Sequence, residues 1–110
     1  FDKYSRSESI FHSIFLLALL DIDFFKKIND TYGHQAGDRA IIAEAELLKL
    51  VFRDPDIVGR MGGDEFAVVS VGLTDTSLKK IHADLDARCR KWNEKSGEKF
   101  SLSISLGGDP

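Results

Sequence analysis

One apolar run limits the folds open to this chain more than any other feature. Residues 14–20 read IFLLALL, seven apolar residues that stop at Asp21. A helix that spans a membrane needs about 20 such residues, so this run is too short to cross one. Its length and its abrupt acidic end are typical of a strand covered on both faces in the middle of a sheet. We therefore expect a buried strand with Asp21 at its exit.

The segments that follow the strand predict helices joined by a loop. Residues 21–29 are short and amphipathic, which predicts one or two helical turns. Residues 31–37 contain two glycines with polar spacers and predict a loop. Asp38 predicts the start of a longer helix with apolar residues at helical spacing, and Pro55 prevents that helix from continuing.

The second half of the chain predicts a hairpin, a helix and a strand. Two β-rich runs, 57–58 and 66–71, flank a Gly-Gly pair that suits a hairpin turn. A helix is expected from residues 75–77 to about Asn93, and residues 100–106 alternate like a strand with one exposed face. This order predicts an α/β (α+β) sandwich in which helices flank a mostly antiparallel central sheet. The length of 110 residues fits a single domain.

Charge and cysteine content exclude some partners and favour one compartment. Lys and Arg total 15 against 18 Asp and Glu, a formal net charge of −3, so we expect no nucleic-acid partner. A local cluster of donors would still suit a small anion. The single cysteine, Cys89, cannot form an internal disulfide, and the chain carries no signal-peptide pattern. These features indicate a cytoplasmic protein, with Cys89 as helix packing.

Three acidic residues are candidates for chemistry because of their positions. Asp21 ends the buried strand, and Asp64 with Glu65 lies in the glycine hairpin. Carboxylates gathered at one place repel one another unless a cation joins them, and Mg²⁺ prefers such oxygen ligands while leaving room for phosphate. The alternative is a solvated turn, because Gly-Gly-Asp-Glu is good hairpin chemistry by itself.

The residues after Asp21 suggest a nucleotide. Phe24 and Phe25 precede Lys26, whose charge suits a triphosphate beside a cation. Asn29 and Asp38 offer the acceptors and donors that read a guanine edge. The alternatives are a solvated Lys26 and an Asp38 that only caps a helix.

Taken together, two long motifs resemble one family. Residues 21–38 read DIDFFKKINDTYGHQAGD and residues 60–66 read RMGGDEF. In this order they resemble the GGDEF family of diguanylate cyclases, over about residues 16–107. The resemblance implies the ferredoxin-like architecture of nucleotide cyclases and polymerase palms. It also implies that two GTP molecules are condensed into cyclic di-GMP, with release of two pyrophosphates, by a homodimer that uses Mg²⁺ or Mn²⁺.

The resemblance also assigns roles to single residues. The metal ligands would be Asp21, the Ile22 carbonyl, Asp64 and Glu65, and the catalytic acids would be Asp64 and Glu65. The substrate-binding residues would be Phe24, Phe25 and Lys26 for the phosphates, Asn29 and Asp38 for guanine, and Gly62 and Gly63 against the nucleotide.

A shorter pattern implies control by the product. Residues 53–56 read RDPD and match the RxxD pattern that precedes the GGDEF hairpin. Arg53 and Asp56 would form an inhibitory site for cyclic di-GMP, with Arg88 or Arg90 as a possible third donor. The alternative is an exposed turn with an incidental ion pair.

Three functions stay open at this point. The first is an active cyclase domain. The second is a catalytically silent GGDEF domain that senses GTP or cyclic di-GMP, and the third is a dimerisation scaffold. We expect residues 1–110 to be one GGDEF domain that is incomplete at both termini and serves as the output module of a longer signalling protein. Any membrane contact would come from other parts of that protein.

Overall fold

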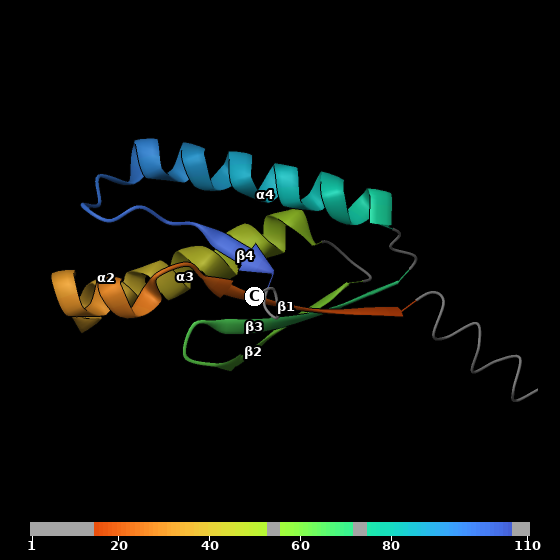
Figure 1. The fold of residues 1–110 in the computed structure, drawn as a ribbon, viewed down its shortest axis with the longest axis horizontal. Coiled ribbons are helices and arrows are strands. Elements are labelled where there is room, and N and C mark those ends of the chain that lie inside the picture. The colour runs from red at the N-terminus through yellow and green to blue at the C-terminus, as the bar shows by residue number, and fades with distance from the viewer. Residues whose placement is uncertain (1–14, 53–55, 72–74, 107–110) are drawn as a thin grey trace, which may run out of the picture.

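The computed structural model describes residues 15–52, 56–71 and 75–106. Within these ranges the chain forms a strand, two helices, a hairpin, a helix and a strand (Figure 1). The strands are β1 (Phe15–Ile22), β2 (Ile57–Gly62), β3 (Glu65–Val71) and β4 (Ile104–Leu106), and the helices are α2 (Phe25–Tyr32), α3 (His34–Val51) and α4 (Asp75–Ser96). The predicted α+β class is confirmed.

The four strands form one antiparallel sheet in the order β2-β3-β1-β4. β1 is central: it pairs with β3 on one side, where Leu20 lies opposite Phe66, and with β4 on the other, where Ile22 lies opposite Ile104. The path from β1 to β2 passes through α2 and α3, and the path from β3 to β4 passes through α4. This is the ferredoxin-like arrangement expected from the resemblance.

The helices α3 and α4 lie on the same side of the sheet (Figure 1). Alternate strand residues point into the layer between them, so Leu20 and Ile22 of β1 and Phe66 and Val68 of β3 are buried. The two helices supply the rest of this layer with Ala40, Ala43, Leu47, Leu48, Leu85 and Cys89. Cys89 is therefore packing, as predicted, and its burial raises the pKa of the thiol to about 11.

The predicted loop over residues 31–37 is wrong. α2 continues to Tyr32, and α3 begins at His34, so the connection between the helices is Gly33 alone. Gly33 has a φ of 95°, in the region that favours glycine, and its N–H donates to the Asn29 carbonyl to end α2. Asp38 consequently lies inside α3 and is not its N-cap.

The last strand is shorter than predicted, although its alternation is kept. Phe100, Leu102 and Ile104 are buried, but only residues 104–106 pair as a strand. Leu102 instead pairs with the side chain of Asn93 in α4: its N–H donates to Oδ1 at 2.7 Å, and its carbonyl accepts from Nδ2 at 3.0 Å. The Asn93 side chain thus supplies both hydrogen-bond partners of the Leu102 backbone, as the backbone of a paired strand would do.

Candidate active site

Asp21 and Asp64 meet at one end of the sheet. Asp21 lies near the end of β1, and Asp64 lies in the turn between β2 and β3. Because β1 and β3 are antiparallel neighbours, the turn returns to the end of β1. The Ile22 backbone N–H donates a 2.9 Å hydrogen bond to Asp64 Oδ2. This bond fixes the Asp64 carboxylate beside the exit of the central strand, where the sequence predicted an acidic site.

The acids at this end of the sheet repel one another. The pKa of Asp21 is raised, mainly because partial burial penalises its charged form, and then because Asp64, Asp23 and Glu65 are close to it. Like charges held together in this way are compensated by a cation. The physical setting therefore agrees with the predicted chemistry of Asp21, Asp64 and Glu65.

The glycine hairpin presents an open tip. Gly63 has a φ of 52°, in the left-handed region, and no atom lies within 4 Å of the place where a Cβ would be. Arg60 stabilises the tip from its own strand, since its Nε donates to the Gly63 carbonyl at 2.8 Å. Glu65 is exposed beside the tip. A bulky ligand can therefore approach the backbone of Gly63 from the side where a Cβ would stand.

The donor set fits a hard divalent cation that keeps part of its water. No three His, Cys, Asp or Glu side chains within residues 15–52, 56–71 and 75–106 are close enough together to form a metal cage. The predicted ligands, which are the carboxylates of Asp21, Asp64 and Glu65 and the Ile22 carbonyl, would still leave positions to water and phosphate oxygen. Mg²⁺ is bound in this manner in many nucleotide enzymes.

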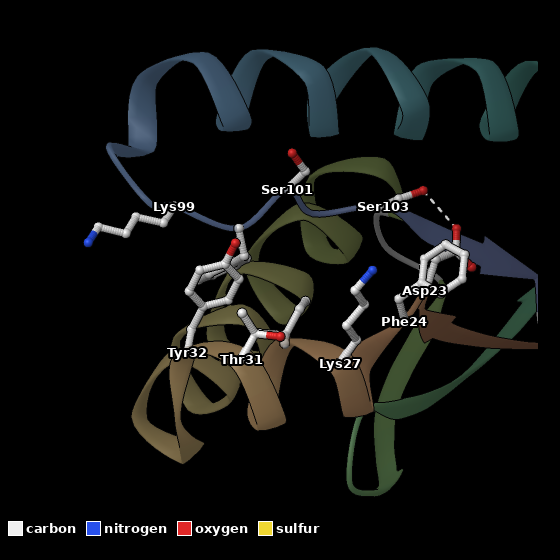
Figure 2. Close-up of a pocket in the computed structure, with 10 residues that line it drawn as sticks. Asp23, Phe24, Lys27, Thr31, Tyr32, Lys99, Ser101 and Ser103 are labelled. Carbon is white, nitrogen blue, oxygen red and sulfur yellow. Dashed lines mark hydrogen bonds between the residues drawn. The ribbon is translucent and has the colours of Figure 1, made fainter.

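Asp23 belongs to the site region although the sequence analysis did not select it. Its Oδ2 accepts hydrogen bonds from the hydroxyls of Ser103, at 2.7 Å, and Ser105, at 2.8 Å (Figure 2 draws the bond to Ser103). These bonds join the residue after β1 to β4, through Ser105, and to the segment just before β4, through Ser103. Its position two residues after Asp21 was a signal, but the serine partners depend on a strand register that the sequence does not reveal.

The residue that precedes α2 has an unusual backbone conformation. Phe24 precedes α2 with a φ of 59°, a left-handed conformation that is uncommon outside glycine, and its side chain is 80% exposed. Phe25 is half-buried against the core, whereas Lys26 is exposed. The first N–H groups of α2 have no partner within the helix, and such groups suit an anion.

A pocket of about 470 Å³ lies beside α2, between this helix and the segment that leads to β4 (Figure 2). Phe24, Lys27, Thr31 and Tyr32 line it from the α2 side. Lys99, Phe100, Ser101 and Ser103 line it from the other side, and Asp23 and Ile28 complete the lining. Lys27 therefore faces this pocket, while Lys26, which the sequence analysis selected, does not line it.

The two residues predicted to read guanine lie on the two helices that Gly33 joins. Asn29 is on α2 and half-buried, and Asp38 is on α3 and exposed. The Asn29 side chain lies against Gly37, so closely that a Cβ on Gly37 would overlap Asn29 Oδ1. Because Gly37 directly precedes Asp38, this contact places the Asn29 side chain against the residue next to Asp38 in the chain.

The predicted product site is only partly described. Arg53 lies outside the described residues, and Asp56 is half-buried just before β2. Arg88, one of the two suggested third donors, pairs with Asp84 one helical turn away at 3.1 Å.

Comparison with known proteins identifies the family. The family model described as diguanylate cyclase, GGDEF domain, matches residues 3–109. The chain belongs to the GGDEF domain family. It is 45% identical over 98 residues to the Probable diguanylate cyclase DgcC of Escherichia coli (strain K12), covering 86% of this chain and 25% of that protein. The chain thus spans about a quarter of this curated relative.

Solved structures agree with this assignment. The diguanylate cyclase SiaD of Pseudomonas aeruginosa, solved with its activator SiaC, superposes with a TM-score of 0.75 at 28% identity, over 96% of this chain and 41% of that one. The GGDEF domain of DgcB from Caulobacter crescentus, solved with c-di-GMP, gives a TM-score of 0.67 at 31% identity, over 94% and 64% of the two chains.

Among the described residues, no helix is both long and apolar enough to span a membrane.

Proposed function

We propose that this chain is a catalytic GGDEF domain that condenses two GTP molecules into cyclic di-GMP and releases two pyrophosphates. The observation that supports the proposal most directly is the hydrogen bond from the Ile22 N–H to Asp64, because it brings the acids of the two motifs together. Membership of the family and the likeness to relatives named diguanylate cyclases support the same reaction.

Each residue near the acids has a role in this proposal. Asp21, the Ile22 carbonyl, Asp64 and Glu65 would hold Mg²⁺ or Mn²⁺, and the cation would neutralise charge on the phosphates during transfer. Phe24, Phe25 and Lys26 hold the terminal phosphates where the free N–H groups of α2 begin. Gly62 and Gly63 lie against the nucleotide, since the space outside Gly63 is open.

Guanine is read by Asn29 and Asp38. A carboxylate accepts from the N1–H and the 2-amino group of guanine, a pair that adenine does not present. The amide of Asn29 supplies both a donor and an acceptor, and its contact with Gly37 restricts its orientation. GTP is therefore preferred over ATP.

The reaction joins two nucleotides held by two copies of the domain. The 3′-hydroxyl oxygen of each GTP attacks the α-phosphorus of the other, and the bond from that phosphorus to the oxygen bridging to the β-phosphate breaks. Pyrophosphate leaves with the electron pair, and the proton of the hydroxyl passes to Glu65, which is exposed beside the hairpin tip. Two such transfers close the ring.

The proposal includes a site for the product. Arg53 and Asp56 bind cyclic di-GMP outside the catalytic site and inhibit the enzyme. Support for this part comes from the RDPD sequence and from the solved relative that contains c-di-GMP.

The test is a product assay with a matched variant. The purified chain is incubated with GTP and Mg²⁺, and the nucleotides are separated by chromatography. Cyclic di-GMP is expected from the wild type and from Glu94→Gln, which changes an exposed acid of α4 far along the chain. Glu65→Gln is expected to form none and to melt like the wild type. A chain that binds GTP but forms no product would contradict the cyclase and favour the sensing alternative.

A further inference from the structure

One carboxyl group is buried where apolar side chains surround it. Glu44 lies on the inner face of α3 with an exposed fraction of 0%, one turn from Ala40 and from Leu47 and Leu48, which are buried with it. Neither Oε1 nor Oε2 has a hydrogen-bond partner among the described residues. The sequence analysis did not select this residue, although its spacing places it on the buried face.

Burial of such a carboxyl group lowers the free energy of unfolding of the domain. A buried polar group without a hydrogen bond loses the water it had in the unfolded chain and gains nothing in exchange. An apolar side chain of similar volume would stabilise the same position. A carboxyl group at this place is therefore explained better by a ligand that it meets than by packing.

The buried Glu44 interacts with the charged groups of the candidate site. After burial itself, the groups that perturb its pKa are Asp64, then Asp21, which raise it, and Arg60 of β2, which lowers it. On the opposite side, Glu44 in turn helps to raise the pKa of Cys89 in α4. The buried carboxyl group of Glu44 is therefore close enough to Asp21 and Asp64, at the acidic end of the sheet, to interact with their charges.

We propose that Glu44 is a further carboxyl group of the cation site, and that it accepts a hydrogen bond from a water ligand of the divalent cation held by Asp21 and Asp64. This inference rests on the proposed function, because it presumes that Asp21 and Asp64 hold the cation. We assign Glu44 a contact through water and not a direct bond, because no three His, Cys, Asp or Glu side chains in the described part of the chain form a group that could hold a metal ion. Mg²⁺ and Mn²⁺ keep several waters, and partners of this outer kind typically orient the site.

The cation also accounts for how the fold tolerates Glu44. Burial, with Asp64 and Asp21 nearby, raises the pKa of this carboxyl to about 9, so it is neutral at pH 7 in the cation-free domain. A neutral carboxyl is less costly to bury than a charged one. A cation between the acids would reverse the local charge and give the Glu44 oxygens a donor.

The test measures cation binding without turnover. Mn²⁺ affinity is determined by titration calorimetry and by the loss of the free-ion electron paramagnetic resonance signal, with no nucleotide present. Glu44→Gln and Glu44→Leu are compared with the wild type, with Asp21→Asn as the variant that removes a direct ligand. Glu46→Gln is the matched control, because Glu46 is an exposed acid two positions along α3.

We expect the affinity for Mn²⁺ to be about tenfold weaker in both Glu44 variants and unchanged in Glu46→Gln. We also expect cation-free Glu44→Leu to melt at a higher temperature than the wild type. The higher melting temperature would show that weaker binding is not misfolding. Glu44 variants that bind Mn²⁺ within twofold of the wild type, while Asp21→Asn does not, would overturn the inference alone. Equal Mn²⁺ binding by the wild type and Asp21→Asn would overturn the proposed cation site as well.

Discussion

Glu44 should make the stability of the cation-free domain depend on pH. Its folded pKa of about 9 lies above the ordinary 4.5, so between these values the folded chain binds one proton that the unfolded chain has lost. The free energy of unfolding therefore falls as pH rises from about 5 to 9, by up to about 1.4 kcal/mol per pH unit. Below pH 4.5 both states are protonated and this dependence disappears.

Urea unfolding of the wild type and of Glu44→Gln across this range measures the effect. The amide cannot titrate, so the variant should show a flatter dependence, and the difference between the two curves isolates Glu44 from other groups. Parallel curves would mean that Glu44 is ionised in the folded state.

Gly37 is a second residue whose role can be tested by itself. Gly37→Ala places a Cβ on the Asn29 side chain, so we expect a loss of about 1–3 kcal/mol of stability and weaker discrimination of GTP from ATP. Asn29→Ala removes the group that the new Cβ meets. The double variant should therefore recover stability but not discrimination.

Gly59→Ala is the control, since nothing lies within 4 Å of its Cβ position. Chemical unfolding of the single and double variants yields the coupling between the two sites. Additive losses would show that Gly37 does not act through Asn29.

At the scale of the elements, Asn93 joins α4 to the segment before β4. Its side chain makes two hydrogen bonds with the backbone of Leu102, so Asn93→Ala leaves a partly buried N–H and carbonyl without partners. We expect a loss of about 2 kcal/mol in the free energy of unfolding, measured in urea. Asn93→Asp keeps the acceptor and loses the donor, and it should lose less than the alanine variant. A loss in Asn93→Ala no larger than that in the exposed neighbour Glu94→Ala would contradict this role.

The elements were predictable where one local signal governs them. The apolar run before Asp21 predicted a strand, and Gly62 with Gly63 predicted a hairpin, because a short apolar run that ends at a charge and a pair of glycines with positive φ are clear signals in sequence. The prediction of a loop over residues 31–37 was wrong because Gly33 and Gly37 cannot be told apart by sequence. Gly33 separates the two helices because its φ is positive. Gly37 continues α3, and it has to be glycine because a Cβ at this position would overlap the Asn29 side chain.

The candidate site was predictable in its acids and less so in its surroundings. Asp21 and Asp64 were selected from their places at the ends of β-rich segments, and the structure brings them together. Asp23 was missed because its partners, Ser103 and Ser105, depend on the register of β1 against β4. Glu44 was not predicted, although helical spacing places it beside Ala40, Leu47 and Leu48, because a charged residue does not signal burial in sequence.

At the scale of the whole molecule, one domain is half of the proposed enzyme. The acids of the two motifs form a single cluster at one end of one sheet, and the predicted guanine pair lies on the two helices that follow β1. Closing a ring from two GTP molecules requires two transfers of the same kind. In the proposed reaction, a second copy of the domain would supply the second nucleotide in the opposite orientation, so that the 3′-hydroxyl of each would face the α-phosphate of the other.

The rate per domain should therefore rise with protein concentration. Where monomers dominate, the active pair forms in proportion to the square of the concentration, so cyclic di-GMP produced per domain increases linearly and levels off once pairs dominate. The assay covers about a thousandfold range of concentration, and light scattering at each point reports the oligomeric state. Mixing in excess Glu65→Gln, which still binds GTP, should suppress the wild type by forming pairs with one defective site. A constant rate per domain in samples that scatter as monomers would contradict the two-domain reaction and leave a single chain to perform both transfers.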